Sequence, residues 1–301
     1  MLAILASLAL LYLGASVLPS KPFTHGSEFC TSGAPSAPTG ATNWGFSKCL
    51  FYVKFTDLTK VDLNNTKNCS SGYAWFTNLT WFGGGGGDSP TPSGNMSINA
   101  NGMGLLASTN TDNLSLLTAV STSGAAYNGS YCGYLFDASK GFFVQMVASL
   151  NSAVEGNPHS SFWMMPLPHL NQGITTWVED DIMEVVDSSG ALSNLHQWTG
   201  ASNTQLNAGC QVISGAIDTA LHTYAKAIVP MSLNSGTGRR ESCVDGVHKT
   251  AADVTYTSSA SAPCSTGSPT GVYSVADTMS YILILGGPFI AVQSVQVWGP
   301  P

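Results

Sequence analysis

The sequence predicts an all-β protein, a sandwich of two antiparallel sheets. Helical periodicity is almost absent, and short runs rich in Val, Ile, Phe, Tyr and Thr recur between clusters of Gly, Ser, Asn and Pro. Two stacked sheets are the natural solution for many short strands. The chain has 301 residues, which is enough to bury a full hydrophobic core, and it contains no internal repeat.

Six runs are the clearest candidate strands. In chain order they are Leu50 to Phe55, Gly104 to Ala107, Gly141 to Leu150, Trp177 to Val186, Thr223 to Val229 and Ala291 to Trp298. The Gly-, Ser- and Pro-rich stretches between them do not separate two self-sufficient halves. We therefore expect a single domain.

The N-terminus has the composition of an export signal. Residues 2–13 form the apolar run LAILASLALLYL, and small residues suited to cleavage follow. A run this short does not cross the roughly 30 Å hydrocarbon core of a bilayer. We expect residues 1–19 to be a signal peptide and residues 20–301 to form the domain, which would be secreted, extracellular and without a membrane segment.

Sequons and cysteines agree with that compartment. The six N-x-S/T sequons are at Asn64, Asn68, Asn78, Asn95, Asn113 and Asn128, as in a glycosylated secreted protein. The seven cysteines are Cys30, Cys49, Cys69, Cys132, Cys210, Cys243 and Cys264. None forms a C-x-x-C pair, which argues against zinc ribbons and thioredoxin-type chemistry. Up to three disulfides and one remaining thiol are expected.

The charge balance restricts the partners. The formal net charge is -7, and the only arginines are Arg239 and Arg240. Nucleic acid needs a dense basic patch, and a heavily sulfated or uronic polymer would also need cations. A neutral polymer fits better. An H-E-x-x-H zinc helix is absent, and we expect no metal, no cofactor and a monomeric chain.

Acid is concentrated in one short stretch, TTWVEDDIMEVVD at 175–187. It places five carboxylates within nine positions of a chain in which 9% of residues are charged. Side chains on a strand alternate between faces, so Glu179 and Asp181 share one face, and Asp180 points to the other. A β-bulge at Ile182–Met183 would bring Glu184 back to the face of Asp181.

Such a row of acids suits sugar chemistry. Retaining glycoside hydrolysis needs a nucleophilic carboxylate and a proton-donating carboxyl about 5 to 5.5 Å apart. Crowding of like charges raises at least one pKa, which keeps one acid protonated near neutral pH. A solvated acidic edge and a calcium site are the alternatives for the spacing alone.

The stretch resembles glycoside hydrolase family 16, whose bulged signature is Glu-x-Asp-x-x-Glu. Two runs before it, GFFVQMVASL (141–150) and SSFWMMP (160–166), also resemble family strands. Four later runs do so in sequence order, LHQW (195–198), LHTYAKAIV (221–229), CVDGV (243–247) and YILILGGPF (281–289). The resemblance covers about 160 residues, from Gly141 to Trp298. It implies a concanavalin A-like jelly-roll sandwich with a cleft on one sheet.

The resemblance also implies roles for individual residues. Glu179 would be the nucleophile, Glu184 the general acid/base and Asp181 the residue that tunes the pair. Three further residues would line the cleft, namely Trp163, Trp177 and His196. The implied activity is that of a secreted endo-acting hydrolase of β-linked polysaccharide, β-1,3-glucan or a related polymer, by a retaining double displacement.

Two positions depart from the family pattern. The residue between the first two acids is usually apolar because it points between the sheets, and here it is Asp180. A charge there costs several kcal/mol unless it is paired or protonated. Ile228 stands where the family often has a tryptophan, which concerns packing more than catalysis.

Other functions fit parts of the sequence. The same fold could host a transglycosylase, a non-catalytic carbohydrate-binding or cell-wall protein, or a β-galactanase of the agarase or carrageenase type. A GDS at 87–89 and the DGVH at 245–248 superficially resemble elements of secreted esterases, with Ser89 as nucleophile and His248 as base. Those esterases are α/β proteins, and PTPSG rather than a helix follows Ser89.

Overall fold

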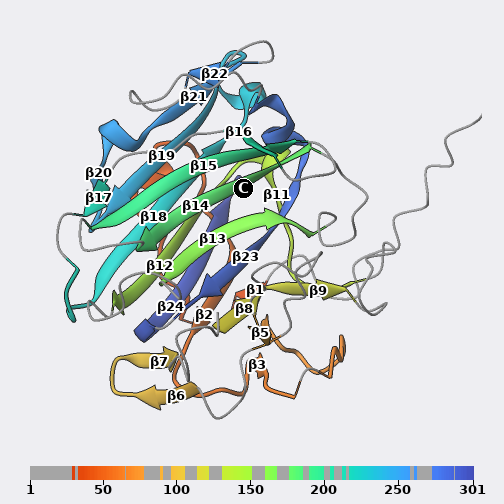
Figure 1. The fold of residues 1–301 in the computed structure, drawn as a ribbon, viewed down its shortest axis with the longest axis vertical. Coiled ribbons are helices and arrows are strands. Elements are labelled where there is room, and N and C mark those ends of the chain that lie inside the picture. The colour runs from red at the N-terminus through yellow and green to blue at the C-terminus, as the bar shows by residue number, and fades with distance from the viewer. Residues whose placement is uncertain are drawn as a thin grey trace, which may run out of the picture.

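A computed structural model describes sixteen segments of the chain, and they form a two-layer jelly-roll β-sandwich (Figure 1). The described segments are 29–30, 33–64, 66–77, 89–90, 96–105, 114–121, 131–150, 160–167, 176–185, 190–199, 204–206, 212–214, 217–257, 261–262, 273–287 and 289–301. The expected all-β jelly-roll class is confirmed.

Sheet A is the layer behind in Figure 1. Its strands follow the order β1 (Phe29–Cys30), β2 (Lys48–Lys54), β24 (Phe289–Gly299), β12 (Phe142–Leu150), β18 (His222–Val229), β19 (Gly238–Val244), β21 (Val254–Tyr256) and β22 (Ser261–Ala262). Three further strands attach to it, β20 (Val247–His248) on β19, β7 (Gly102–Leu105) on β24 and β6 (Met96–Asn99) on β7.

Sheet B lies in front. Its order is β16 (Thr204–Leu206), β15 (Ala191–Thr199), β14 (Thr176–Val185), β13 (Ser161–Pro166), β23 (Ser280–Gly286), β8 (Leu114–Leu117), β4 (Trp75–Phe76) and β3 (Val61–Asp62). β11 (Phe136–Asp137) pairs with β23, β17 (Val212–Ser214) with β15, and β5 (Ser89–Pro90) with β8. The acidic stretch is therefore in β14, inside sheet B.

Little else is regular in the described segments. β9 (Ala119–Ser121) and β10 (Tyr131–Gly133) pair with each other. The one α-helix of these segments is α1 (Thr39–Thr42), and four short 3-10 turns complete them: η2 (Ala138–Lys140), η4 (Met231–Leu233), η5 (Thr250–Ala252) and η6 (Tyr273–Thr278). No helix in the described part of the chain is long and apolar enough to cross a membrane.

All six predicted strands are confirmed within a few residues, as β2, β7, β12, β14, β18 and β24. Residues 106 and 107 of the second predicted run lie outside the described residues. The pairing is mostly antiparallel, as expected. Three short pairs differ and are parallel, β1 with β2, β3 with β4, and β5 with β8.

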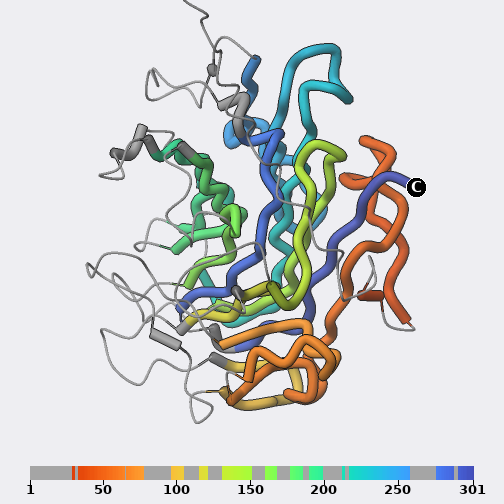
Figure 2. Tube along the Cα trace, turned by 90° about the vertical axis from the view of Figure 1, so that its right-hand side faces the viewer, coloured from red at the N-terminus to blue at the C-terminus, as the bar shows by residue number. Residues whose placement is uncertain are grey.

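The main core fills the space between the sheets, and a second, smaller core lies on the other face of sheet A. The second core contains Ala41, Phe46, Phe143, Ala225, Ala227, Val229, Cys243 and Trp298. Residues 33–46, which include α1, cover this face. In Figure 2 they belong to the red to orange trace on the right, on the side of sheet A that is turned away from the green strands of sheet B. Both faces of sheet A are thus buried here.

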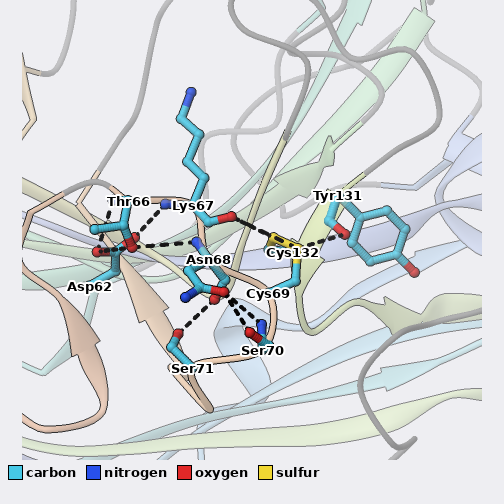
Figure 3. Close-up of a disulfide and its surroundings, with 9 residues drawn as sticks. All are labelled: Asp62, Thr66, Lys67, Asn68, Cys69, Ser70, Ser71, Tyr131 and Cys132. Atoms are coloured by element: carbon cyan, nitrogen blue, oxygen red, sulfur yellow. Dashed lines mark hydrogen bonds between the residues drawn. A yellow bond between two sulfur atoms is a disulfide. The ribbon is translucent and has the colours of Figure 1, made fainter.

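Two disulfides are present, Cys30–Cys49 and Cys69–Cys132. The second one joins the loop after β3 to β10 (Figure 3). In that loop the buried Asp62 carboxylate accepts hydrogen bonds from the backbone N–H groups of Thr66 and Lys67 at 3.0 and 2.8 Å. Cys243 is free and buried, whereas Cys210 and Cys264 lie outside the described residues.

Two of the predicted sequons can be placed. Asn64 and Asn68 are both exposed, in the loop that carries Cys69. The other four sequon asparagines and the predicted signal peptide at 1–19 lie outside the described residues.

Candidate active site

Strand β14 carries the predicted bulge. On the β15 side, Asp181 pairs with Asn194 and Glu184 pairs with Leu192, so three steps along β14 match two steps along β15. The register with β13 shifts at the same place, between the partners of Phe162 and Trp163. The one extra residue lies at Ile182–Met183. Glu179, Asp181 and Glu184 therefore share one face of sheet B.

Strand β15 supplies one polar partner to each acid. The contacts are Trp198 Nε1–H donating to Glu179 Oε2 at 2.9 Å, His196 Nε2 with Asp181 Oδ2 at 3.1 Å, and Asn194 Nδ2–H donating to Glu184 Oε2 at 2.9 Å. The three partners alternate along the strand, so they lie on a single face beside the acids. The site is a row of three acids, each held by its own neighbour.

The indoles nearby are more enclosed than a sugar-stacking platform would be. The Trp177 ring stacks on the Trp198 ring at 5.4 Å between centroids and 9° between planes, and Trp177 is 2% exposed. Trp163 pairs with Asp181 across β13 and β14 and is 7% exposed. Trp177 thus backs the indole that binds Glu179. Contact of Trp163, Trp177 or His196 with a ligand stays a prediction.

Crowding and burial shift the titration of the row. Burial, followed by the charge of Asp181, raises the pKa of Glu179 from 4.5 to about 8. Burial and then the charge of Glu184 raise the pKa of Asp181. Burial lowers the pKa of His196, but the hydrogen bond and charge of Asp181 outweigh it and raise this pKa to about 9. At neutral pH the imidazole is cationic and Glu179 retains its proton.

Asp180 points away from the row, between the two sheets, as its position in the alternation predicted. It is 0% exposed. Its carboxylate forms an ion pair with Lys226 Nζ through Oδ1 and accepts a hydrogen bond from Arg240 Nε through Oδ2 at 2.8 Å. The expected need for a partner is therefore met twice, from β18 and from β19.

Three residues of the site were missed in the sequence, namely Asn194, Trp198 and Lys226. The first two alternate with His196 along β15, and that period of two could have identified them. Lys226 lies on the face of β18 that is turned toward β14, in a run that reads as a buried strand. Nothing local in the sequence marks it as part of a site.

Two groups of side chains have metal-like geometry. Ligand atoms of Glu179, Asp181 and His196 lie within 4.8 Å of one another. Two of these atoms already have partners in the structure, because Glu179 Oε2 accepts from the Trp198 indole and His196 Nε2 contacts Asp181 Oδ2. The second group is Glu241, His248 and Asp253, whose two carboxylates already bind the Arg239 guanidinium at 2.9 and 3.4 Å. We assign no metal to either group.

The esterase alternative is not assembled by the fold. Ser89 lies in β5 of sheet B, whereas His248 lies in β20 of sheet A, and Figure 1 shows the two strands far apart. His248 Nε2 instead contacts Asp253 Oδ1 at 2.8 Å.

Fold and site together define a jelly-roll β-sandwich with a row of three partnered acids on the outer face of one sheet. The structure is similar to that of an endo-1,3-β-glucanase from Streptomyces sioyaensis, with a TM-score of 0.50 and 18% identity over 89% of this chain and 100% of that one. It is also similar to a GlcNAcα1-4Gal-releasing endo-β-galactosidase from Clostridium perfringens, with a TM-score of 0.52 and 15% identity over 91% of this chain and 65% of that one. At these identities the shared feature is the fold.

The sequence itself has no such match. No protein-family model matches the chain, and no curated protein matches it either.

Proposed function

We propose that this protein is a secreted, endo-acting glycoside hydrolase that cleaves β-linked polysaccharide with retention of configuration. The observation that carries the proposal is the row Glu179, Asp181 and Glu184 on one sheet face, each acid bound by a side chain of β15. An acidic edge exposed to solvent would not need three dedicated partners. The two enzymes with a similar fold support the reaction class, since both are named as endo-acting on β-linked sugars.

Glu179 is the proposed nucleophile. The Trp198 indole N–H donates to its Oε2, and a donor favours the ionised form of a carboxylate. The negative charges of Asp181 and Glu184 both raise the pKa of Glu179. Glu179, with a pKa of about 8, holds a proton while its neighbours are charged, and protonation of Glu184 removes one of those charges and lowers the pKa of Glu179. The reactive arrangement is therefore the one in which the proton lies on Glu184 and Glu179 is ionised.

Glu184 is the proposed general acid/base. In the first step it donates its proton to the glycosidic oxygen while Glu179 attacks the anomeric carbon, which expels the leaving sugar and forms a glycosyl-enzyme. In the second step the Glu184 carboxylate takes a proton from water, the water oxygen attacks the anomeric carbon, and Glu179 leaves as a carboxylate. Asp181, paired with cationic His196, lies between the two glutamates and tunes their charge.

The proposed substrate is a neutral polymer, β-1,3-glucan or a related glucan. A chain with only two arginines, of which Arg240 is buried, and a net charge of -7 is poorly suited to a polyanion. A β-galactan is the second candidate, because one of the similar folds belongs to an endo-β-galactosidase. Transfer to a sugar hydroxyl in place of water would use the same two glutamates.

Export is part of the proposal. Two disulfides among the described residues are typical of an oxidising compartment, and the apolar run at 2–13 is proposed to be the export signal. We further propose that the domain acts as a monomer.

The proposal is tested with Glu179→Gln and Glu184→Gln, screened against laminarin, mixed-linkage glucan, agarose and carrageenan with analysis of the products. Each variant should fold and lose several orders of magnitude in turnover, because each removes a role that water does not fill. Glu241→Gln is the matched control, since this glutamate lies in sheet A, binds the Trp44 indole, and should not affect turnover. Wild-type rates in either folded site variant would refute the assignment.

The stereochemistry gives a second test. Proton NMR of the first products should show the anomer that the cleaved bond had, because two displacements restore the configuration. Initial release of the opposite anomer would exclude Glu179 as a nucleophile. A chain that binds these polymers but releases no product would instead be a carbohydrate-binding protein.

A further inference from the structure

A buried ionic cluster lies between the sheets, directly under the row of acids. It consists of Asp180, Lys226, Arg240 and Asp277, which are 0%, 1%, 0% and 8% exposed. Two carboxylates and two cations give it no net charge. Tyr256 donates a hydrogen bond to Asp277 Oδ1 at 2.5 Å, and the Arg240 guanidinium lies over the Tyr256 ring at 5.2 Å. Buried charges arranged in this way are paired, but they remain costly relative to an apolar core.

Within the cluster Lys226 has contacts that the other members lack. Besides its ion pair with Asp180, its ammonium donates to the backbone carbonyl of Asp181 at 2.9 Å and to that of Asn194 at 3.0 Å. These two residues pair with each other across β14 and β15, and they are the last pair before the bulge. The ammonium therefore bridges the two strands at the point where the regular ladder stops.

The two residues that Lys226 holds each carry part of the site. The side chain of Asp181 is the middle acid, and the side chain of Asn194 binds Glu184. Asp181 O also accepts a hydrogen bond from Ser193 Oγ at 2.9 Å, so this carbonyl is fixed by two donors. A shift of either carbonyl would move Asp181 against His196, or Asn194 against Glu184.

We propose that Lys226 is a positioning residue, which sets the spacing of Asp181 and Glu184 by clamping the backbone of β14 to that of β15 beneath the bulge. The inference rests on the proposed function of the row. It assigns the lysine a role beyond the neutralisation of Asp180, which Arg240 also performs. Displacement of a reacting group by about 1 Å can lower the rate about 100-fold. A gain of this size in rate explains why a buried lysine is kept at this position despite the free-energy cost of burying its charge.

Arg240 provides the matched control. It belongs to the same cluster, is equally buried and binds the same carboxylate. It also contacts Arg239 O at 3.2 Å, Asp277 Oδ1 at 3.8 Å and the side chains of Tyr256 and Tyr281, and among the described residues none of these contacts is with the backbone of β14 or β15. Arg240→Met and Lys226→Met therefore both disturb the cluster, but only the second releases the two carbonyls.

The first test compares kcat and KM of these variants on the polysaccharide that wild type cleaves, at a temperature where circular dichroism shows each to be folded. Lys226→Met should lower kcat about 100-fold with little change in KM, while Arg240→Met keeps kcat within a few fold. Lys226→Gln, which retains an N–H donor without the charge, should lie between them and replaces Lys226→Met if that variant does not fold. Equal kcat in the lysine and arginine variants would overturn the proposal.

The second test does not depend on activity. The groups facing His196 are Glu179, Asp181 and Glu184 from β14, with Lys226 below them from β18. The pKa of His196 is followed by NMR, with His196→Asn to assign its signal. Removal of a cation alone would raise this pKa, whereas displacement of Asp181 would lower it from about 9 toward its ordinary value of 6.5.

We expect the pKa of His196 to fall in Lys226→Met and not to fall in Arg240→Met, which removes a cation without releasing the two carbonyls. A rise in Lys226→Met would show that the lysine acts through its charge, and the positioning role would be rejected. Because this readout needs no substrate, the clamp is tested even if the chain cleaves no glycan. Failure of the wild-type protein to cleave any glycan would instead refute the proposed function.

Discussion

The Trp198 indole is the residue whose contribution is easiest to isolate, because a second indole makes the same contact elsewhere. Trp198→Phe keeps an aromatic ring against Trp177 but removes the N–H that binds Glu179. A hydrogen bond to a charged group is worth about 1.5–3 kcal/mol, so kcat should fall about 10- to 100-fold. Trp44→Phe is the control, since Trp44 Nε1 donates to Glu241 Oε2 at 2.8 Å outside the row. Equal losses in both variants would contradict a specific role.

The pKa of Glu179 makes a prediction about stability. The folded protein holds this proton up to a pH of about 8, whereas the ordinary value is 4.5, so between these values the native state binds more protons than the unfolded chain. Stability from this group is present below pH 4.5 and is lost as the pH rises through 8. Glu179→Gln has no ionisable group at this position, so its stability does not decrease in this way as the pH rises. The Tm of Glu179→Gln minus the Tm of wild type should therefore increase between pH 4.5 and pH 8. A Tm difference that stays constant or decreases over this pH range would be inconsistent with the raised pKa.

At the scale of single residues, alternation predicted the faces of Glu179, Asp180 and Asp181 correctly, and the predicted bulge placed Glu184 correctly. The partners were not predictable to the same extent. Asn194 and Trp198 meet Glu184 and Glu179 only through the register of β15 on β14, which the pattern within neither strand determines. Lys226 meets Asp181 across the two sheets, a contact that no periodicity within either strand encodes.

The bulge in β14 is a feature of the element and has a test of its own. Both neighbouring strands show a register shift at this point, so deletion of Met183 would leave β14 regular against both. Glu184 would stay on the face of Asp181, because two residues on a regular strand share a face when one lies between them. Deletion of Ile182 as well would place Glu184 directly after Asp181 and turn it toward the core.

We therefore expect the single-deletion variant to fold and to retain measurable turnover, and the double-deletion variant to lose turnover and stability together. Turnover and Tm of the two purified variants are the measurements. An active double-deletion variant would mean that alternation along β14 does not determine the direction of Glu184.

The longer strands were predictable as elements and the shortest ones were not. β12, β14, β18 and β24 each have a run of eight or more residues in which apolar side chains recur. β1, β3 and β5 have two residues each, and they join their neighbours in parallel, a pairing that requires a long connection and leaves no local pattern.

On the scale of the whole molecule, Asp180 links the two layers through its contacts with Lys226 and Arg240. Asp180→Asn leaves two buried cations facing a neutral amide. Loss of one partner from a buried ion pair typically costs about 3–5 kcal/mol. The free energy of unfolding from urea melts should fall by about that amount, while the kcat of the folded variant stays close to that of wild type. A variant as stable as wild type but inactive would mean that Asp180 faces the substrate.

The sandwich was predictable as a whole because strand patterns recur along most of the chain. The covering of sheet A was not. Residues 33–46 contain Gly, Pro, Ser and Thr in no regular period. The burial of Ala41 and Phe46 follows from the apolar outer face of sheet A, which presents Phe143, Ala225, Ala227 and Trp298.

That covering makes Cys243 a natural sensor of local opening. Gly40 lies so close that an added Cβ would be 3.6 Å from the Cys243 sulfur and 2.9 Å from the Phe143 ring. Burial, and then the charge of Glu241, raises the thiol pKa to about 11, so this sulfur is protonated and shielded in the native state. A thiol reagent needs both access and thiolate. The rate at which native protein is labelled at Cys243 therefore measures the frequency with which residues 33–46 open away from sheet A. Gly40→Val should increase this labelling rate and leave the three acids of sheet B unchanged.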